Sequence, residues 1–350
     1  MMNKLFIVFF LCASFLFSDS KKDDFDQLMG KNSRHWTHVG QKVDVDALNR
    51  YKQLYDRQKG LRHLKAADVK IPKIVHFIWL GPRPFPRESV HNVRTWMAQN
   101  PDWTFKFWTD RPRDPPCQGM EIILMKEYPF PSLGRCYQTS ENWGEKSDVL
   151  RFEILYNQGG VYVDHDANCL QPFEGMHGAY DFYCGLEAPH PLVVGLNITA
   201  GNGVIGSRPG HPVVKEVIDL IDQRWEDLAK KYPGTDGYSK TQIVMERTYI
   251  ALTHAIQKKL DLPGNADIVL PAAYFFAKPG IKPLYSQHFF ANSWAKVDNK
   301  DVDFEKGIQK TLNKLDKKLK KTLVIVGSFL SFNLLLIAFG IIFTKKMRII

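Results

Sequence analysis

A helix, a glycine turn and a strand that ends in two carboxylates follow one another within residues 146–166, and this order constrains the fold more than any other feature. Ser147 is a good helix N-cap, and the apolar spacing after it predicts a helix that stops at Gly159-Gly160. The short β-rich run Val161–Val163 then leads into Asp164-His165-Asp166. Such a unit is typical of an α/β sheet.

The residues before this unit predict the opening of the same sheet. Ile74–Leu80 is β-rich and reads as a buried strand, Val90–Asn100 as a helix, and Trp103–Trp108 as a second strand. A strand, a helix and a strand in this order begin a parallel α/β sheet. Further helices are expected at about 212–230 and 241–260, followed by a strand near 268–270. Together these elements fit one catalytic domain.

The two carboxylates of the motif are candidate ligands for a metal ion. Asp164 and Asp166 lie two residues apart at a strand end, so their side chains point to the same side. Open α/β sheets bind ligands beyond the carboxyl ends of their strands. Paired carboxylate oxygens with open positions suit Mg²⁺ or Mn²⁺, which also bind phosphate oxygens of a substrate.

Asp148 and Arg151 are three residues apart and share one face of the preceding helix. The carboxylate can accept from sugar or ribose hydroxyls, and the guanidinium can donate a fork to a phosphate or stabilise the acidic pair. Taken singly, an Asp-x-Asp is common in loops, and this pair could be a solvated salt bridge. Together with the glycine turn, the four charged residues indicate a nucleotide-sugar site.

These residues carry a resemblance to glycosyltransferase family 32. The family's DXD sugar-binding region has the pattern S-D-x-x-R-[FY]-x-x-L-x-x-x-G-G-x-Y-x-D-x-D, and this chain matches it throughout. The matching residues are Ser147, Asp148, Arg151, Phe152, Leu155, Gly159, Gly160, Tyr162, Asp164 and Asp166. The family resembles the yeast initiating α-1,6-mannosyltransferase and the mannosyl-inositol-phosphoceramide synthase subunits. It resembles α-1,4-galactosyltransferases and large clostridial glucosylating toxins more distantly.

Four other blocks resemble the family, at 71–81, 100–110, 202–212 and 288–294, so the resemblance covers roughly residues 70–295. It implies a Rossmann-like nucleotide-sugar transferase fold of the A type. It also implies a divalent metal, Mn²⁺ or Mg²⁺, a UDP- or GDP-hexose donor, and retention of the anomeric configuration.

The resemblance also implies roles for individual residues. Asp166 would be the principal metal ligand, while Asp164 would contact sugar or ribose hydroxyls and support the metal. Asp148 and Arg151 would hold the donor sugar. Trp79, at the end of the first strand, would stack on the nucleotide base.

Five further residues are expected around the donor. Tyr162 would belong to the donor site, and Ser293 and Trp294 would close over the diphosphate. Asn202 would face the donor or acceptor sugar, with a turn residue as the alternative. His288 would touch the metal or the acceptor, with a packed core histidine as the alternative.

The positive charge of the chain is concentrated at one end. Residues 306–350 hold ten Lys or Arg and one acid, Asp316, a net of +9, so only +1 of the formal +10 remains for the other 305 residues. A near-neutral body argues against a nucleic-acid partner. Leu323–Phe343 is 21 uncharged residues between lysine-rich flanks, enough to span a bilayer, and predicts a transmembrane helix.

The other segments complete the expected organisation. Residues 1–20 resemble a signal peptide or signal anchor, and 21–70 would form a stem or peripheral helices. The catalytic domain is expected at 71–300, followed by a basic linker at 301–322, the membrane helix at 323–343, and a basic tail at 344–350. The membrane would belong to the secretory pathway, as in the Golgi, with a bacterial membrane as the alternative.

The cysteines leave their chemistry open. Cys117, Cys136, Cys169 and Cys184 form no CxxC pair, which argues against zinc, and no disulfide pairing can be read from them. Asn197-Ile-Thr is a glycosylation sequon within an apolar stretch.

The sequence therefore predicts a membrane-anchored, metal-dependent, retaining hexosyltransferase that acts on a glycan or lipid acceptor. The alternatives are an inactive nucleotide-sugar-binding or scaffold relative, and a membrane-tethered structural protein. The complete motif argues against both of these alternatives.

Overall fold

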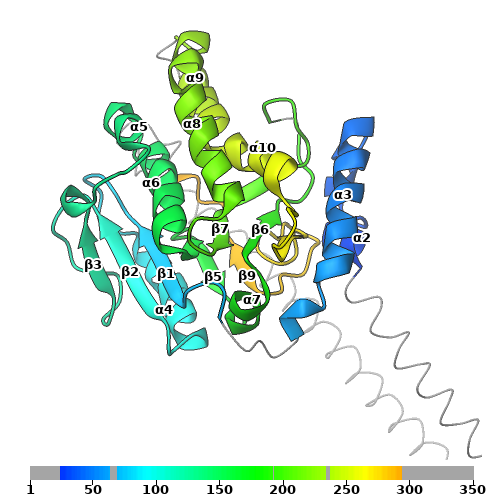
Figure 1. The fold of residues 1–350 in the computed structure, drawn as a ribbon, viewed down its shortest axis with the longest axis horizontal. Helices are drawn as coiled ribbons and strands as arrows, with labels where there is room; N and C mark the ends of the chain where they lie inside the picture. Colours follow the sequence, from blue (N-terminus) through cyan, green and yellow to red (C-terminus); the bar gives the residue numbers. More distant parts are fainter. Residues whose placement is uncertain (1–23, 64–68, 192, 234–236, 294–350) are drawn as a thin grey trace, which may run out of the picture. The chain divides into compact units, whose positions relative to one another are not determined.

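A computed structural model describes residues 24–63, 69–191, 193–233 and 237–293 of the chain (Figure 1). All of them fall in the first of two units into which the chain divides, Met1–Ala295. The predicted leader 1–20, the predicted membrane helix 323–343 and Trp294 lie outside the described residues. Among the helices that are described, none has both the length and the apolar character needed to cross a membrane.

A mixed sheet of seven strands forms the centre of the described unit, in the order β3-β2-β1-β4-β7-β6-β8 (Figure 1). The strands are β1 Ile74–Ile78, β2 Thr104–Thr109, β3 Glu121–Leu124, β4 Gly160–Val163, β6 Phe182–Leu186, β7 Ala200–Ser207 and β8 Asp267–Leu270. Only β7 runs antiparallel to its neighbours. The first residues of β7 therefore lie at the same edge as the carboxyl ends of β4 and β6.

A small antiparallel sheet joins β5 Ala167–Cys169 to β9 Ser286–His288. The helices around the strands are α2 Phe25–Leu28, α3 Lys42–Gln58, α4 Arg87–Gln99, α5 Gly134–Thr139, α6 Trp143–Gln158, α7 Glu174–Ala179, α8 Pro212–Lys231, α9 Gly237–Val244 and α10 Ile250–Lys259. Short 3₁₀ turns occur at Arg34–His38, Leu61–His63 and Met125–Glu127. The helix α8 packs against α6 and α10, and α3 packs beside β8 (Figure 1).

The predicted parallel opening of the sheet is confirmed, since β1 and β2 pair in parallel and α4 connects them. The predicted N-cap of α6 is wrong. The N-cap is Asn142, five residues earlier, because its side chain accepts hydrogen bonds from the N–H groups of Gly144 and Glu145. The Ser147 hydroxyl instead donates to the carbonyl of Trp143 within the helix.

The predicted single helix at 241–260 is interrupted. A π-helical turn, Met245–Tyr249, separates α9 from α10. Such turns are rare and occur frequently at functional sites. Here the turn changes which side chains face α6, as described below.

The turn from α6 into β4 requires glycine. Gly159 and Gly160 have φ of +66° and +94°, which is the left-handed region. A Cβ on Gly160 would lie 2.6 Å from the carbonyl oxygen of Ile74. The Gly159 carbonyl lies 2.8 Å from Nε2 of the fully buried His76, and burial lowers the pKa of His76 to about 3. His76 is therefore a neutral core residue of β1.

The helices before β1 belong to the packed body. Phe25 of α2 and Tyr51 and Tyr55 of α3 are buried in the main core. The hydroxyl of Tyr55 lies 3.0 Å from that of Tyr274, which follows β8.

The four body cysteines and the sequon also have definite surroundings. Cys117, Cys136, Cys169 and Cys184 are all free thiols in the structure. The side chain of Asn197 is buried, and its amide donates to the carboxylate of Asp44 at 3.0 Å. A glycan on this side chain would break that contact.

Candidate active site

Three potential metal ligands converge at the carboxyl end of β4. Nε2 of His288 lies 3.2 Å from Oδ2 of Asp164 and 3.3 Å from Oδ1 of Asp166, and one ligand atom of each residue fits within 4.8 Å of the others. The pairing of β5 with β9 brings His288 here, because Ala167, directly after the motif, lies opposite His288 in the ladder.

The space beside this cluster depends on Gly203 of β7. A Cβ at this position would lie 2.7 Å from Oδ2 of Asp164 and 2.9 Å from Nε2 of His288. Two carboxylates and one imidazole form a donor set that suits a divalent cation. The residues present therefore fit the metal that the sequence predicts, and the identity of the ion stays a prediction.

The cluster is charged even without an ion. Burial alone would raise the pKa of Asp164, but the guanidinium of Arg151 and the hydrogen bond from His288 outweigh burial and hold it well below its usual range. Burial would lower the pKa of His288, but Asp166 and Asp164 raise it above its ordinary value. Both shifts follow from opposite charges in close contact.

Arg151 connects the cluster to α6. Its guanidinium lies 2.5 Å from Oδ1 of Asp148 and 3.4 Å from Oδ1 of Asp164, and it covers the ring of Tyr162 at 4.0 Å. The Tyr162 hydroxyl donates to Oδ1 of Asp164 at 2.5 Å. Arg151 is 4 % exposed, so the alternative of a solvated salt bridge is wrong. Nε of Arg151 is buried without a partner among the described residues, which leaves one strong donor for a ligand.

Two further residues hold Asp148. The amide of Asn202 donates to its Oδ1 at 3.3 Å, and the hydroxyl of Thr248 lies 2.5 Å from its Oδ2. Burial raises the pKa of Asp148, while Arg151 and Thr248 oppose that shift. Asn202 therefore contacts Asp148, and its contact with a sugar stays a prediction. Thr248 also contacts Asp148, and the sequence did not indicate it as a site residue. Thr248 belongs to the π-helical turn. A search for helical periodicity in the sequence does not show where the side chains of such a turn point.

Trp79 and Ser293 meet at His165, the middle residue of the Asp-x-Asp motif. The half-buried ring of Trp79 stands edge-on to that of His165, with centroids 5.0 Å apart. The two ring nitrogens of His165 lie 2.8 Å from the hydroxyl of Ser89 and 3.2 Å from that of Ser293. His165 and Ser89 were not predicted as site residues, and His165 lies in the turn that follows β4, between Asp164 and Asp166.

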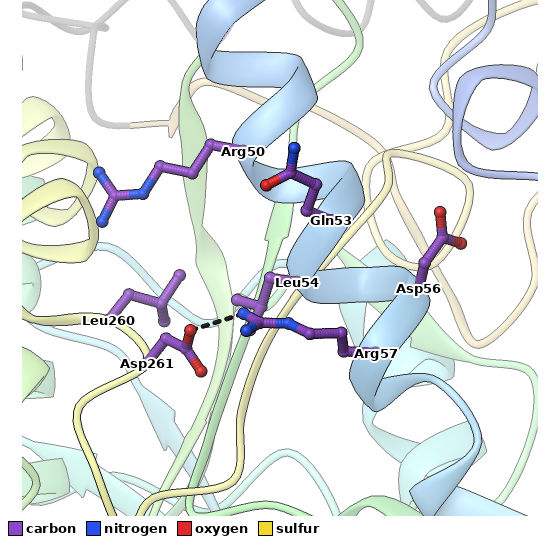
Figure 2. Close-up of a pocket in the computed structure, with 7 residues that line it drawn as sticks. All are labelled: Arg50, Gln53, Leu54, Asp56, Arg57, Leu260 and Asp261. Carbon is purple, nitrogen blue, oxygen red and sulfur yellow. Dashed lines mark hydrogen bonds and ion pairs between the residues drawn. The ribbon is translucent and has the colours of Figure 1, made fainter.

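A separate pocket of about 620 Å³ lies between α3 and the turn after α10 (Figure 2). Figure 2 shows Arg57 reaching across it to Asp261, at 2.6 Å. The Asp261 N–H donates to the carboxylate of Asp267, the first residue of β8. The pocket is therefore at the amino end of β8, whereas the Asp164 cluster is at the carboxyl end of the parallel strands, so it is not part of the candidate site.

Comparison with known proteins finds a family model that matches part of this chain. Residues 86–183 match the family model described as "Glycosyltransferase sugar-binding region containing DXD motif". Asp148, Arg151, Asp164 and Asp166 fall inside the match, and Trp79, Asn202, His288 and Ser293 fall outside it.

Two relatives and one solved structure illustrate the similarity. The chain is 27 % identical over 174 residues to "Subversion of eukaryotic traffic protein A" of Legionella pneumophila, covering 45 % of this chain and 26 % of that protein. It is 24 % identical over 235 residues to "Inositol phosphoceramide mannosyltransferase 1" of Schizosaccharomyces pombe, and the match covers 66 % of this chain and 64 % of that protein. The catalytic domain of alpha-toxin from Clostridium novyi superimposes with a TM-score of 0.45 at 12 % identity. The superposition covers 84 % of this chain and 92 % of that domain.

The chain spans less than two thirds of the length of either of these two relatives. Within that span, the matches confirm that the chain resembles glycosyltransferases, as the sequence motif indicated. Residues 86–183, which carry Asp148, Arg151, Asp164 and Asp166, are thus similar to the DXD-containing sugar-binding region of glycosyltransferases.

Proposed function

We propose that this chain is a membrane-anchored, metal-dependent glycosyltransferase that moves a hexose from a nucleotide sugar to a glycan or lipid acceptor, with retention of configuration. The observation that carries the proposal is the buried Arg151. It joins Asp148 on α6 to Asp164 after β4, and Asp164 touches the histidine of the ligand cluster. The residue proposed to bind the sugar and the residues proposed to bind the metal thereby share one site.

Each residue has a defined task in this proposal. Asp164, Asp166 and His288 would hold the ion, which when bound would neutralise charge on the leaving diphosphate. Asp148 accepts hydrogen bonds from donor-sugar hydroxyls, and the free Nε–H of Arg151 donates to the same ligand. Thr248 and Asn202 fix the carboxylate of Asp148, so that it does not have to be ordered when the donor binds.

Trp79 and Ser293 complete the donor site in the proposal. Trp79 lies at the carboxyl end of β1 and offers an aromatic surface to the nucleotide base. Ser293 is tied to the motif through His165. Its hydroxyl would close over the diphosphate together with Trp294, which lies outside the described residues.

The donor and acceptor classes follow from the relatives and the predicted anchor. The name of the Schizosaccharomyces pombe relative describes a mannosyltransferase for inositol phosphoceramide, which makes GDP-mannose the first donor to test and a lipid head group the first acceptor. UDP-glucose and UDP-galactose remain alternative donors. The uncharged run 323–343 would keep the site close to a membrane, in the secretory pathway or in a bacterium.

The test is mass spectrometry of acceptors after incubation with the full-length protein in mild detergent. Each of the three donors is supplied with Mn²⁺, and the acceptors are inositol phosphoceramide and methyl α-D-mannopyranoside. We expect one acceptor to gain the mass of one hexose from one donor. A folded protein that modifies neither acceptor with any donor contradicts the proposed activity, and binding of a donor in that case would favour the inactive relative.

A further inference from the structure

The carboxylate of Glu187 lies beside the proposed donor site and has no part in it so far. We propose that Glu187 binds a hydroxyl group of the acceptor sugar, an inference that rests on the proposed function. Glu187 directly follows β6, and its N–H donates to the carbonyl of Thr199 just before β7. Because β7 is antiparallel, its first residues, which include Asn202 and Gly203, connect Glu187 to Asp148 and Asp164 along one edge.

One oxygen of Glu187 is held and the other is available. The hydroxyl of Tyr249 donates to Oε1 at 2.9 Å and lies 2.6 Å from the hydroxyl of the buried Thr199. Oε2 faces the ammonium of Lys278 at 3.9 Å, beyond hydrogen-bond distance, and the side chain keeps 16 % of its surface exposed. Within the part of the chain that the structure describes, Oε2 has no hydrogen bond. An exposed acceptor oxygen on a fixed carboxylate is suited to a hydroxyl donor.

Lys278 links this carboxylate to the metal-ligand cluster. Its Nζ lies 3.0 Å from the centre of the Phe290 ring, and that ring lies 4.6 Å from the ring of His288.

The charges around Glu187 favour the acceptor sugar over the donor as its ligand. The donor carries a diphosphate, and a carboxylate repels this negative charge. The donor sugar is already assigned to Asp148 and Arg151 of α6, on the β4 side of β7. Glu187 approaches from the β6 side of β7. A carboxylate next to an ammonium offers an acceptor and a donor to a neutral polyhydroxyl compound, which is the chemistry of an acceptor sugar.

The test compares two reactions of the same protein with the same donor. Full-length wild-type and Glu187→Gln proteins are given GDP-mannose and Mn²⁺, and transfer to methyl α-D-mannopyranoside or to inositol phosphoceramide is measured beside hydrolysis of the donor by water. We expect transfer to fall about tenfold or more, because a charge-assisted hydrogen bond is lost. Hydrolysis and the KM for GDP-mannose should stay within about twofold, because the donor site is untouched.

Two variants keep the result interpretable. Glu174→Gln makes the same change at an exposed residue that pairs with Lys73 on the surface, and should alter neither reaction. Tyr249→Phe leaves Glu187 charged but removes the bond to Oε1, and should lower transfer by less than Glu187→Gln does, again without changing hydrolysis. It provides the same test if the glutamine variant does not fold.

The outcomes separate the two proposals. Equal losses of transfer and hydrolysis in Glu187→Gln, or unchanged transfer, would overturn the role of Glu187. A folded wild-type protein that transfers hexose to neither acceptor would instead contradict the proposed function.

Discussion

Gly203→Ala tests whether the Asp164, Asp166 and His288 cluster binds a metal ion. The new Cβ would lie 2.7 Å from Oδ2 of Asp164, and ordinary contact begins at 3.4 Å, so the carboxylate would have to move by about 0.7 Å. Asp164 cannot rotate away freely, because Tyr162 and Arg151 hold its other oxygen. Metal–ligand distances tolerate only about 0.2 Å. We therefore expect a loss of Mn²⁺ affinity of about 10- to 100-fold, the range seen when the support of a ligand is disturbed.

Isothermal titration of the purified protein with Mn²⁺ measures this affinity. Gly203 does not have a positive φ, so alanine adds no backbone strain, and thermal unfolding without metal should change little. Gly40→Ala is the matched control, since a Cβ there meets nothing within 4 Å. Unchanged Mn²⁺ affinity in a folded Gly203→Ala protein would refute the metal assignment of this cluster.

Three other predictions follow from the same geometry. Thr248→Val should raise the donor KM about tenfold through loss of the bond to Asp148, and Thr248→Ser should restore it, in steady-state assays of nucleotide release; equal effects of the two variants would reject the role. Trp79→Ala should weaken nucleotide binding by about 1–3 kcal/mol in titrations with GDP or UDP, whereas Trp79→Phe should retain most of it; equal binding by all three proteins would exclude stacking. Burial lowers the pKa of His76 and of His177 to about 3, so only the unfolded chain takes up these protons as the pH falls below about 6.5. Urea unfolding should therefore give a lower free energy at pH 5 than at pH 7, and a flat profile would contradict their burial as neutral groups.

The part of the site that the spacing of residues predicted, without the family resemblance, is local in the chain. Asp148, Arg151, Asp164 and Asp166 belong to one helix–turn–strand unit, and two glycines with positive φ fix the turn between them. Their spacing places them in one short segment, although Asp164 and Asp166 lie in the turn after β4 and not within the strand. The parallel start of the sheet was predictable for the same reason, because β1, α4 and β2 follow one another directly.

The rest of the site depends on long-range packing. His288 joins the cluster only because β9 pairs with β5, a contact between segments more than a hundred residues apart. Thr248 reaches Asp148 because a π-helical turn shifts the register of its helix. The open space next to Asp164 depends on Gly203 in a neighbouring strand. None of these arrangements leaves a periodic pattern in the sequence around the residue concerned.

The most direct test of the central claim is release of nucleotide from sugar donors by the full-length protein. GDP-mannose, UDP-glucose and UDP-galactose are each incubated with Mn²⁺ or with EDTA, beside an Asp166→Asn variant that retains an oxygen for the N–H of Ala291. We expect release from one donor that requires Mn²⁺ and is lost in the variant. Release that is equal with EDTA and in the variant, or no release by a folded protein from any donor, would contradict a metal-dependent nucleotide-sugar site at Asp164, Asp166 and His288.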